Sequence, residues 1–153
     1  MRITELFQNR EFVVSAEIGP PKGIHIDGLV EEAKEYLTGV HYVNVTDNQS
    51  SVMRLGGLAT CKVLKDAGLT PIFQLTCRDR NLNATKALLL GLYAEGVREV
   101  LAITGDPIPT AERDEVKNVY QFNSRKLAQY IVSLAGEGRE MPGPMTVFGA
   151  LNL

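Results

Sequence analysis

The sequence predicts an α/β protein built on a parallel β-sheet, and three observations support this fold class. Five short segments are rich in β-branched and apolar residues, as buried parallel strands are. Patterns typical of amphipathic helices lie between these segments, so strands and helices alternate along the chain. The chain has 153 residues, 44% of them hydrophobic, which is enough to bury the core of a single domain. This alternation implies right-handed crossovers between parallel strands.

The predicted strands begin at regular intervals. The first four start at residues 12, 41, 71 and 99, which are 29, 30 and 28 residues apart, whereas the fifth starts at 145. The extra length lies in residues 107–122, after the carboxyl end of the fourth strand, where α/β proteins bind ligands. The five predicted strands are Phe12–Ile18, His41–Asp47, Pro71–Cys77, Glu99–Gly105 and Met145–Asn152.

Four helices are predicted between the strands from apolar periodicity, capping residues and glycine stops. The third is expected over residues 84–95. The expected starting or capping residues are Asp27, Ser50 or Ser51, Asn81 or Asn83, and Asn123 or Ser124, and Gly68 and Gly96 are expected to end the second and third helices.

Polar residues recur at the carboxyl ends of four predicted strands. Side chains two residues apart share a face of a strand. The outer polar residues stand at 17, 46, 76 and 106, which are 29, 30 and 30 residues apart, so they predict the floor of a polar pocket. A role in bonding strand-end amides stays open for Ser15, Asn44 and Thr76, and it is weaker for the carboxylates, which are costly in apolar surroundings. The pairs are Ser15 with Glu17, Asn44 with Thr46, Gln74 with Thr76, and Thr104 with Asp106.

Charge and composition exclude several other classes of function. A formal net charge of −2 offers no basic surface for nucleic acid. The two histidines and two cysteines form no CxxC motif, so neither a metal site nor a Ser-His-Asp triad is expected. Cys61 and Cys77 are expected to be small buried residues. The sequence has no signal peptide and no membrane-spanning apolar run, so a cytoplasmic protein without membrane contact is expected.

Four motifs at the strand ends resemble the methylenetetrahydrofolate reductase family, whose members are FAD-dependent (βα)8 barrels. The motifs are SAEIGPPK at residues 15–22, VNVTDN at 43–48, QLTCRDRN at 74–81 and LAITGDP at 101–107. The resemblance extends from about residue 11 to the end of the sequence and rests on the order and spacing of the motifs. It implies a parallel TIM barrel, of which about five strands and four helices are present here.

The length of the chain is short for such a barrel, which takes roughly 200 residues or more. Residues 1–153 are therefore expected to be a single α/β domain, the N-terminal portion of a reductase domain that is incomplete at its C-terminus. A longer parent protein is favoured, while a second chain that completes the barrel and an open sheet are the two alternatives.

The resemblance also implies catalytic roles for two carboxyl groups. Glu17, before the Gly-Pro-Pro turn, would be the general acid on the folate. Asp106 would lie near the flavin and the pterin, where its charge stabilises an iminium cation. The implied reaction reduces 5,10-methylenetetrahydrofolate to 5-methyltetrahydrofolate by hydride transfer from reduced FAD, within one-carbon and methionine metabolism.

Residues that would bind FAD follow from the same matches, with two departures. Gln74 stands where several members have histidine, and Thr104 stands where they have arginine, which removes a fixed donor for an anionic cofactor. Arg78 and Arg80, just beyond the third predicted strand, are expected to be solvated loop residues, and the alternative is that they compensate for the missing arginine. Gly105 would let the backbone approach the ring system. The expected cofactor-binding residues are Thr46, Asp47, Gln74, Thr104, Gly105, Asp106 and Tyr120.

The partners implied are a folate substrate and an electron donor, which is either NAD(P)H or an electron-transfer protein. A homo-oligomer or a partner subunit is compatible with the sequence. The alternative function is that of a non-catalytic pterin- or flavin-binding module that acts with a partner protein.

Overall fold

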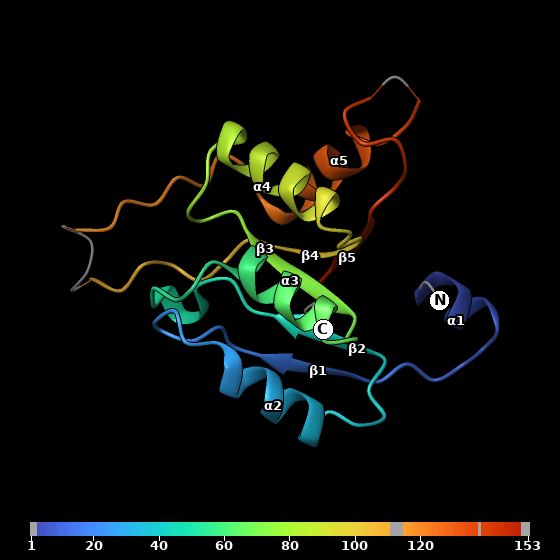
Figure 1. Ribbon diagram of the computed structural model, residues 1–153. Helices are drawn as coiled ribbons and strands as arrows, with labels where there is room; N and C mark the ends of the chain where they lie inside the picture. Colours follow the sequence, from blue (N-terminus) through green and yellow to red (C-terminus); the bar gives the residue numbers. More distant parts are fainter. Residues whose placement is uncertain (1–2, 111–114, 138, 151–153) are drawn as a thin grey trace.

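The computed structural model describes residues 3–110, 115–137 and 139–150, and it contains a five-stranded, all-parallel sheet (Figure 1). The strands lie in the order β1-β2-β3-β4-β5, so each pairs with its neighbour in sequence. This sequential order, with a helix after each of the first four strands, is that of a (βα)8 barrel, and it confirms the predicted fold class. The strands are β1 (Ser15–Ile18), β2 (Tyr42–Val45), β3 (Pro71–Thr76), β4 (Glu99–Ile103) and β5 (Thr146–Gly149).

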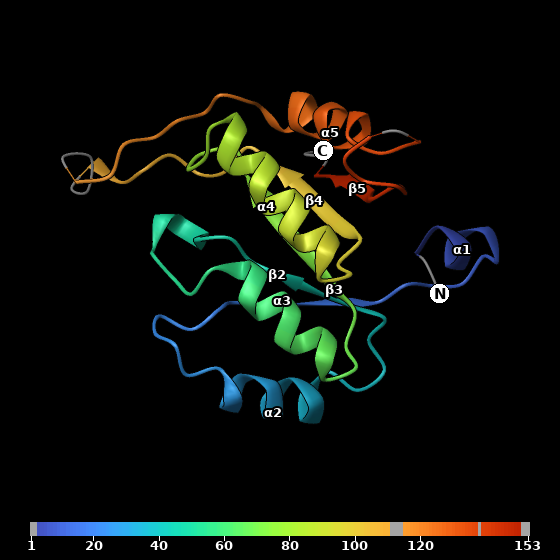
Figure 2. The ribbon, with the colours of Figure 1, turned by 45° about the horizontal axis from the view of Figure 1, so that its top comes forward.

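Four helices cover one face of the sheet, which we call the outer face (Figure 2). They are α2 (Asp27–Tyr36), α3 (Gly57–Asp66), α4 (Leu82–Ala94) and α5 (Ser124–Ser133). Their apolar residues pack against alternate strand residues in one continuous core, to which β3 contributes the fully buried Phe73 and Leu75. The intervening strand residues face the opposite side, the inner face, where the polar pairs were predicted.

Two of the predicted helix caps are confirmed. Asn81 precedes α4 and its side chain accepts a hydrogen bond from the backbone N–H of Ala84 at 3.0 Å. Asn123 does the same for α5, from the N–H of Lys126 at 2.9 Å. The cap predicted at Asp27 is wrong, because Asp27 is already the first residue of α2 and no side chain caps that helix.

The predicted start of the second helix is also wrong. Ser50 and Ser51 belong to a 3-10 turn, Gln49–Ser51, in which both serines have positive φ angles of 55° and 63°. Such angles interrupt a right-handed helix, so α3 begins only at Gly57.

The first strand is shorter than predicted, since β1 begins at Ser15 and Phe12 is 87% exposed. The fifth strand begins at Thr146, and the predicted end at Asn152 lies outside the described residues.

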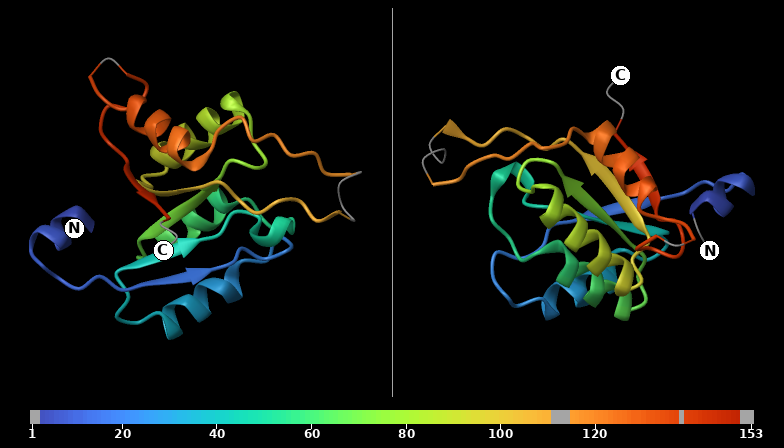
Figure 3. Two further views of the ribbon diagram at one scale, coloured as in Figure 1. Left: turned by 180° about the vertical axis from the view of Figure 1, so that it is seen from behind. Right: turned by 90° about the horizontal axis from the view of Figure 1, so that it is seen from above.

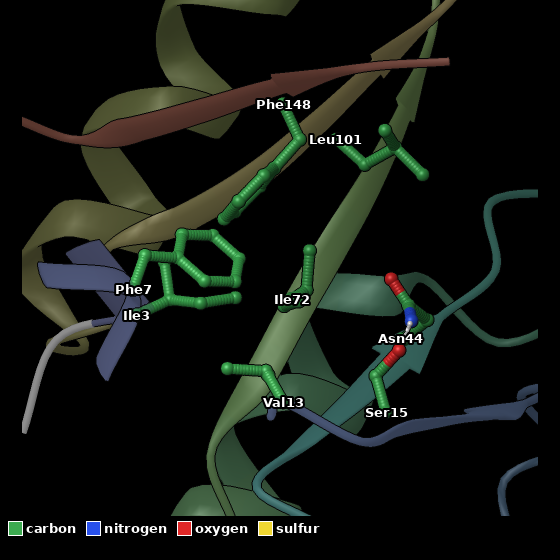
Figure 4. Close-up of a pocket in the computed structure, with 8 residues that line it drawn as sticks. All are labelled: Ile3, Phe7, Val13, Ser15, Asn44, Ile72, Leu101 and Phe148. Carbon is green, nitrogen blue, oxygen red and sulfur yellow. Dashed lines mark hydrogen bonds between the residues drawn. The ribbon is translucent and has the colours of Figure 1, made fainter. Parts of the chain in front are cut away.

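A short helix that was not predicted, α1 (Ile3–Gln8), lies beyond the amino ends of the strands, away from the other helices (Figure 3). Ile3 and Leu6 are buried there against Tyr42 and Ile72, in a second and smaller apolar cluster. The inner face beside α1 holds a mainly apolar cavity of about 250 Å³ (Figure 4). The inner face is therefore apolar at its amino end.

Gly57, the first residue of α3, marks the tightest approach of a helix to the sheet. A Cβ atom there would lie 2.5 Å from Cε2 of Phe73, which is fully buried. We expect Gly57→Ala to lower the free energy of unfolding by about 1–3 kcal/mol in a urea titration, because neither backbone nor ring can withdraw freely. Gly28→Ala in α2 is the control, since no atom lies within 4 Å of its added Cβ, and it should leave stability unchanged or raise it. Equal responses of the two variants would contradict this packing.

Among the described residues, no helix is long and apolar enough to cross a membrane.

Candidate functional site

The polar residues of the inner face meet at the carboxyl ends of β2, β3 and β4, around a cavity of about 190 Å³. Five of the predicted site residues line this cavity, and they come from three consecutive strand ends. They are Thr46, Asp47, Gln74, Gly105 and Asp106.

Glu17 reaches the same region through a side-chain contact across the sheet. The Gln74 amide donates a hydrogen bond from Nε2 to Oε2 of Glu17 at 2.8 Å, although β2 lies between their strands. Neighbouring strands are about 4.8 Å apart, so the two long side chains extend toward each other over the inner face of β2. Glu17 and Asp106 are both exposed, so neither carboxyl lies in the apolar surroundings that the sequence suggested.

Thr104 does not continue the inner face of β4, so the prediction that it is in phase with the other strand-end pairs is wrong, although Thr104 and Asp106 both line a second cavity of about 410 Å³. Thr76 pairs in register with Ile103, so Ile103 occupies the expected position on the inner face. The hydroxyl of Thr104 instead accepts a hydrogen bond from the N–H of Ser124, at the start of α5, at 3.3 Å. Gly105 then turns the chain with a φ of 90° and brings Asp106 back to the cavity.

The absent side chain of Gly105 faces protein rather than open space. A Cβ atom there would lie 3.1 Å from Oγ1 of Thr76 and 3.3 Å from Cβ of Arg78. Glycine is therefore required by the packing and the backbone angle of this loop.

Tyr120 also lies in this loop, with a positive φ of 41°. Its hydroxyl donates to the carbonyl oxygen of Asp106 at 3.0 Å, and the carbonyl of Gly105 lies at 3.3 Å. Three other non-glycine residues with positive φ angles, Asn48, Ser50 and Ser51, lie in the loop after β2. Strained backbone of this kind clusters at functional sites.

The two arginines after β3 are not solvated as predicted. Arg80 forms a bidentate ion pair with Asp47, in which Nη2 donates to Oδ1 at 2.9 Å and Nη1 donates to Oδ2. Asp47 is buried and also accepts the N–H of Thr76 at 3.2 Å. Its carboxylate thus joins the end of β2 to the end of β3.

Arg78 is 2% exposed, so the favoured expectation of a solvated loop residue is wrong for it. Its guanidinium donates to both carboxylate oxygens of Asp79, at 2.7 and 2.8 Å. Burial acts to raise the pKa of Asp79, but the hydrogen bonds and charge of Arg78 outweigh it and hold the pKa below its usual value. Arg78 lines the cavity, but β3 ends at Thr76, so the period-two alternation of residues 74 and 76 could not by itself place Arg78 there.

Thr46 carries an unsatisfied polar atom in the cavity wall. Thr46 is 2% exposed, and its side-chain oxygen Oγ1 has no hydrogen-bond partner among the described residues. A buried hydroxyl without a partner is costly, and such atoms often await a ligand or water. Thr46 is therefore the most direct mark of a binding site at these strand ends.

The two cysteines are buried and their thiols are poor nucleophiles. Cys77 is buried as predicted, and burial raises the pKa of its thiol to about 11, so the reactive thiolate is scarce at neutral pH. Burial also raises the pKa of Cys61. Within residues 3–110, 115–137 and 139–150, no three His, Cys, Asp or Glu side chains are grouped to hold a metal ion.

Comparison with known proteins identifies one family. The family model described as methylenetetrahydrofolate reductase matches residues 2–138, which include β1 to β4 and every predicted site residue. No curated protein matches the chain.

Proposed function

Because the chain belongs to the methylenetetrahydrofolate reductase family, we propose that it acts as a flavin-dependent oxidoreductase on a folate one-carbon unit. The proposed reaction converts 5,10-methylenetetrahydrofolate to 5-methyltetrahydrofolate. The observation that carries this proposal is the meeting of Glu17, Thr46, Gln74 and Asp106 at one polar end of the sheet.

The residues around the cavity fit the hydrogen-bonding edge of a flavin. The unpartnered hydroxyl of Thr46 and the amide of Gln74 supply both donors and acceptors. Thr46, Gln74 and the loop around Asp106 would therefore hold FAD. When bound, FAD would supply the hydride for the folate, and NAD(P)H or an electron-transfer protein would be its electron donor.

Glu17 and Gln74 form the proton-donating pair of the proposed mechanism. Opening the five-membered ring of the folate requires a proton on the departing nitrogen, and Glu17 is the carboxyl group that would deliver it. The bond from Gln74 Nε2 fixes one oxygen of Glu17, which leaves the other oxygen to face the substrate. Gln74 would therefore orient the acid as well as contact the cofactor.

Asp106 has a different role, because the opened folate is a cation. A carboxylate already in place at the cavity stabilises developing positive charge without reorganisation. Arg78 and Tyr120 both donate hydrogen bonds to the main-chain carbonyl of Asp106. These bonds fix the backbone position from which the Asp106 side chain extends.

One observation favours the alternative of a non-catalytic binding module. Both Glu17 and Asp106 are exposed, whereas catalytic carboxyl groups commonly work in a closed, water-poor site. A partner protein that covers this end of the sheet would supply the closure. Such a module would bind flavin or pterin but would not reduce folate by itself.

The flavin part of the proposal is tested by incubating the chain with FAD, desalting it and recording its visible spectrum. We expect a retained band near ~450 nm, and roughly tenfold weaker FAD binding for Thr46→Val, since one hydrogen bond is lost. Thr70→Val is the matched control, because Thr70 is exposed and precedes the amino end of β3. A folded chain that is colourless after incubation with excess FAD and desalting would contradict the proposal.

A further inference from the structure

Arg78 connects three loops that carry the proposed site. Its Nη2 donates to the carbonyl of Asn48 after β2 at 2.9 Å, and its Nη1 donates to the carbonyl of Asp106 after β4 at 3.3 Å. Its own carbonyl accepts the N–H of Val119 at 2.7 Å, from the long loop before α5. One buried side chain at the end of β3 thus contacts the loops that follow β2 and β4.

The role of this side chain is geometric rather than electrostatic. The charge of Arg78 is paired with Asp79 on the same loop, and the hydrogen bonds that its guanidinium donates to that carboxylate raise the pKa of Arg78. The remaining donors of the guanidinium point at backbone carbonyls of neighbouring loops. A rigid planar fork can meet such separate acceptors together, which a lysine ammonium on a flexible stem cannot do in the same way.

We propose that Arg78 is a positioning residue, which sets the place of the Asp106 carboxylate by holding the Asp106 main chain. The inference rests on the proposed function, in which Asp106 stabilises the folate cation. Tyr120 donates to the same carbonyl at 3.0 Å, so the peptide after Asp106 is held from two sides. A displacement of about 1 Å at a reacting group lowers rates by up to roughly 100-fold, so such positioning has a measurable effect.

The test is a double-mutant cycle with Arg78→Lys, Asp106→Asn and the double variant in the full chain. Two quantities are measured for each protein, the single-turnover rate of folate reduction and the FAD dissociation constant from fluorescence quenching. We expect Arg78→Lys to slow reduction by about tenfold when Asp106 is present, but by less than about twofold when Asp106 is already replaced. Arg78→Lys should likewise weaken FAD binding more when Asp106 is present than when Asp106 is already replaced by Asn.

Thermal unfolding of each variant separates positioning from a loss of fold. Arg98→Lys is the matched control, because Arg98 also donates to backbone carbonyls, of Tyr93 and Val97, at the opposite end of the sheet. If Arg78→Lys does not fold, Asp79→Asn takes its place in the cycle. This variant keeps the arginine but removes the carboxylate charge that holds its guanidinium.

Additive effects of the two variants on both quantities would overturn the positioning role while leaving the proposed reductase intact. An Arg78→Lys protein as active as Arg98→Lys would overturn it too. A wild-type chain that neither binds FAD nor reduces folate would instead overturn the proposed function, and the inference with it.

Discussion

Glu17→Gln is expected to lower the rate of folate reduction by about 100- to 10,000-fold, the usual contribution of a positioned general acid. Glutamine keeps the size of the side chain and its contact with the Gln74 amide, but it cannot release a proton. The retained visible band of FAD and the temperature of unfolding should both stay unchanged. The measurement is the rate at which reduced, FAD-loaded protein is reoxidised by methylenetetrahydrofolate.

The control for this variant is Glu31→Gln, which makes the same chemical change at an exposed position of α2. It should leave both the rate and the spectrum unaltered. If Glu17→Gln reduced folate as fast as Glu31→Gln, Glu17 would not be the acid. If Glu17→Gln lost FAD as well as activity, its role would be in binding rather than in proton transfer.

Asp47→Asn should be the most destabilising of the conservative polar replacements. Asp47 is buried, pairs with Arg80 through both oxygens and accepts the N–H of Thr76. An amide at this position turns one acceptor into a donor and leaves the guanidinium without its charge partner. Breaking a buried ion pair from one side costs about 3–5 kcal/mol, so the midpoint of urea unfolding should fall strongly.

Asp66→Asn provides the comparison, because Asp66 pairs with Lys62 on the surface of α3, with side chains 60% and 46% exposed. Exposed pairs contribute about 0–1 kcal/mol, so this variant should unfold close to the wild type. Similar midpoints for Asp47→Asn and Asp66→Asn would show that the strand ends do not depend on the buried pair.

The strand-end pattern located most of the candidate site because spacing and alternation are properties of the backbone. Glu17 and Gln74 were found in this way, and their side chains meet across β2. Thr104 was misplaced for a local reason, since alternation holds only while the strand continues. β4 ends at Ile103, and the φ of 90° at Gly105 changes the direction of the chain, which a repeat of residue types does not reveal.

Other features depended on contacts between distant segments. Arg78 follows a strand and precedes Asp79, which is typical of a solvated loop, and only the approach of the loops after β2 and β4 buries it. α1 was missed because its two buried residues are too few to give a helical period. The start of α3 was misplaced because two serines that resemble helix caps adopt positive φ angles in the preceding turn.

The sequential strand order has a consequence for how the chain acquires its structure. Each strand pairs with the strand before it, so the sheet can grow by one βα unit at a time as the chain leaves the ribosome. Pairing a strand with its neighbour in sequence costs less loop-closure entropy than pairing it with a more distant strand. The bond between Glu17 and Gln74 spans 57 residues and closes over a strand already in place. The proton donor would thus be completed only after β3 has joined the growing sheet.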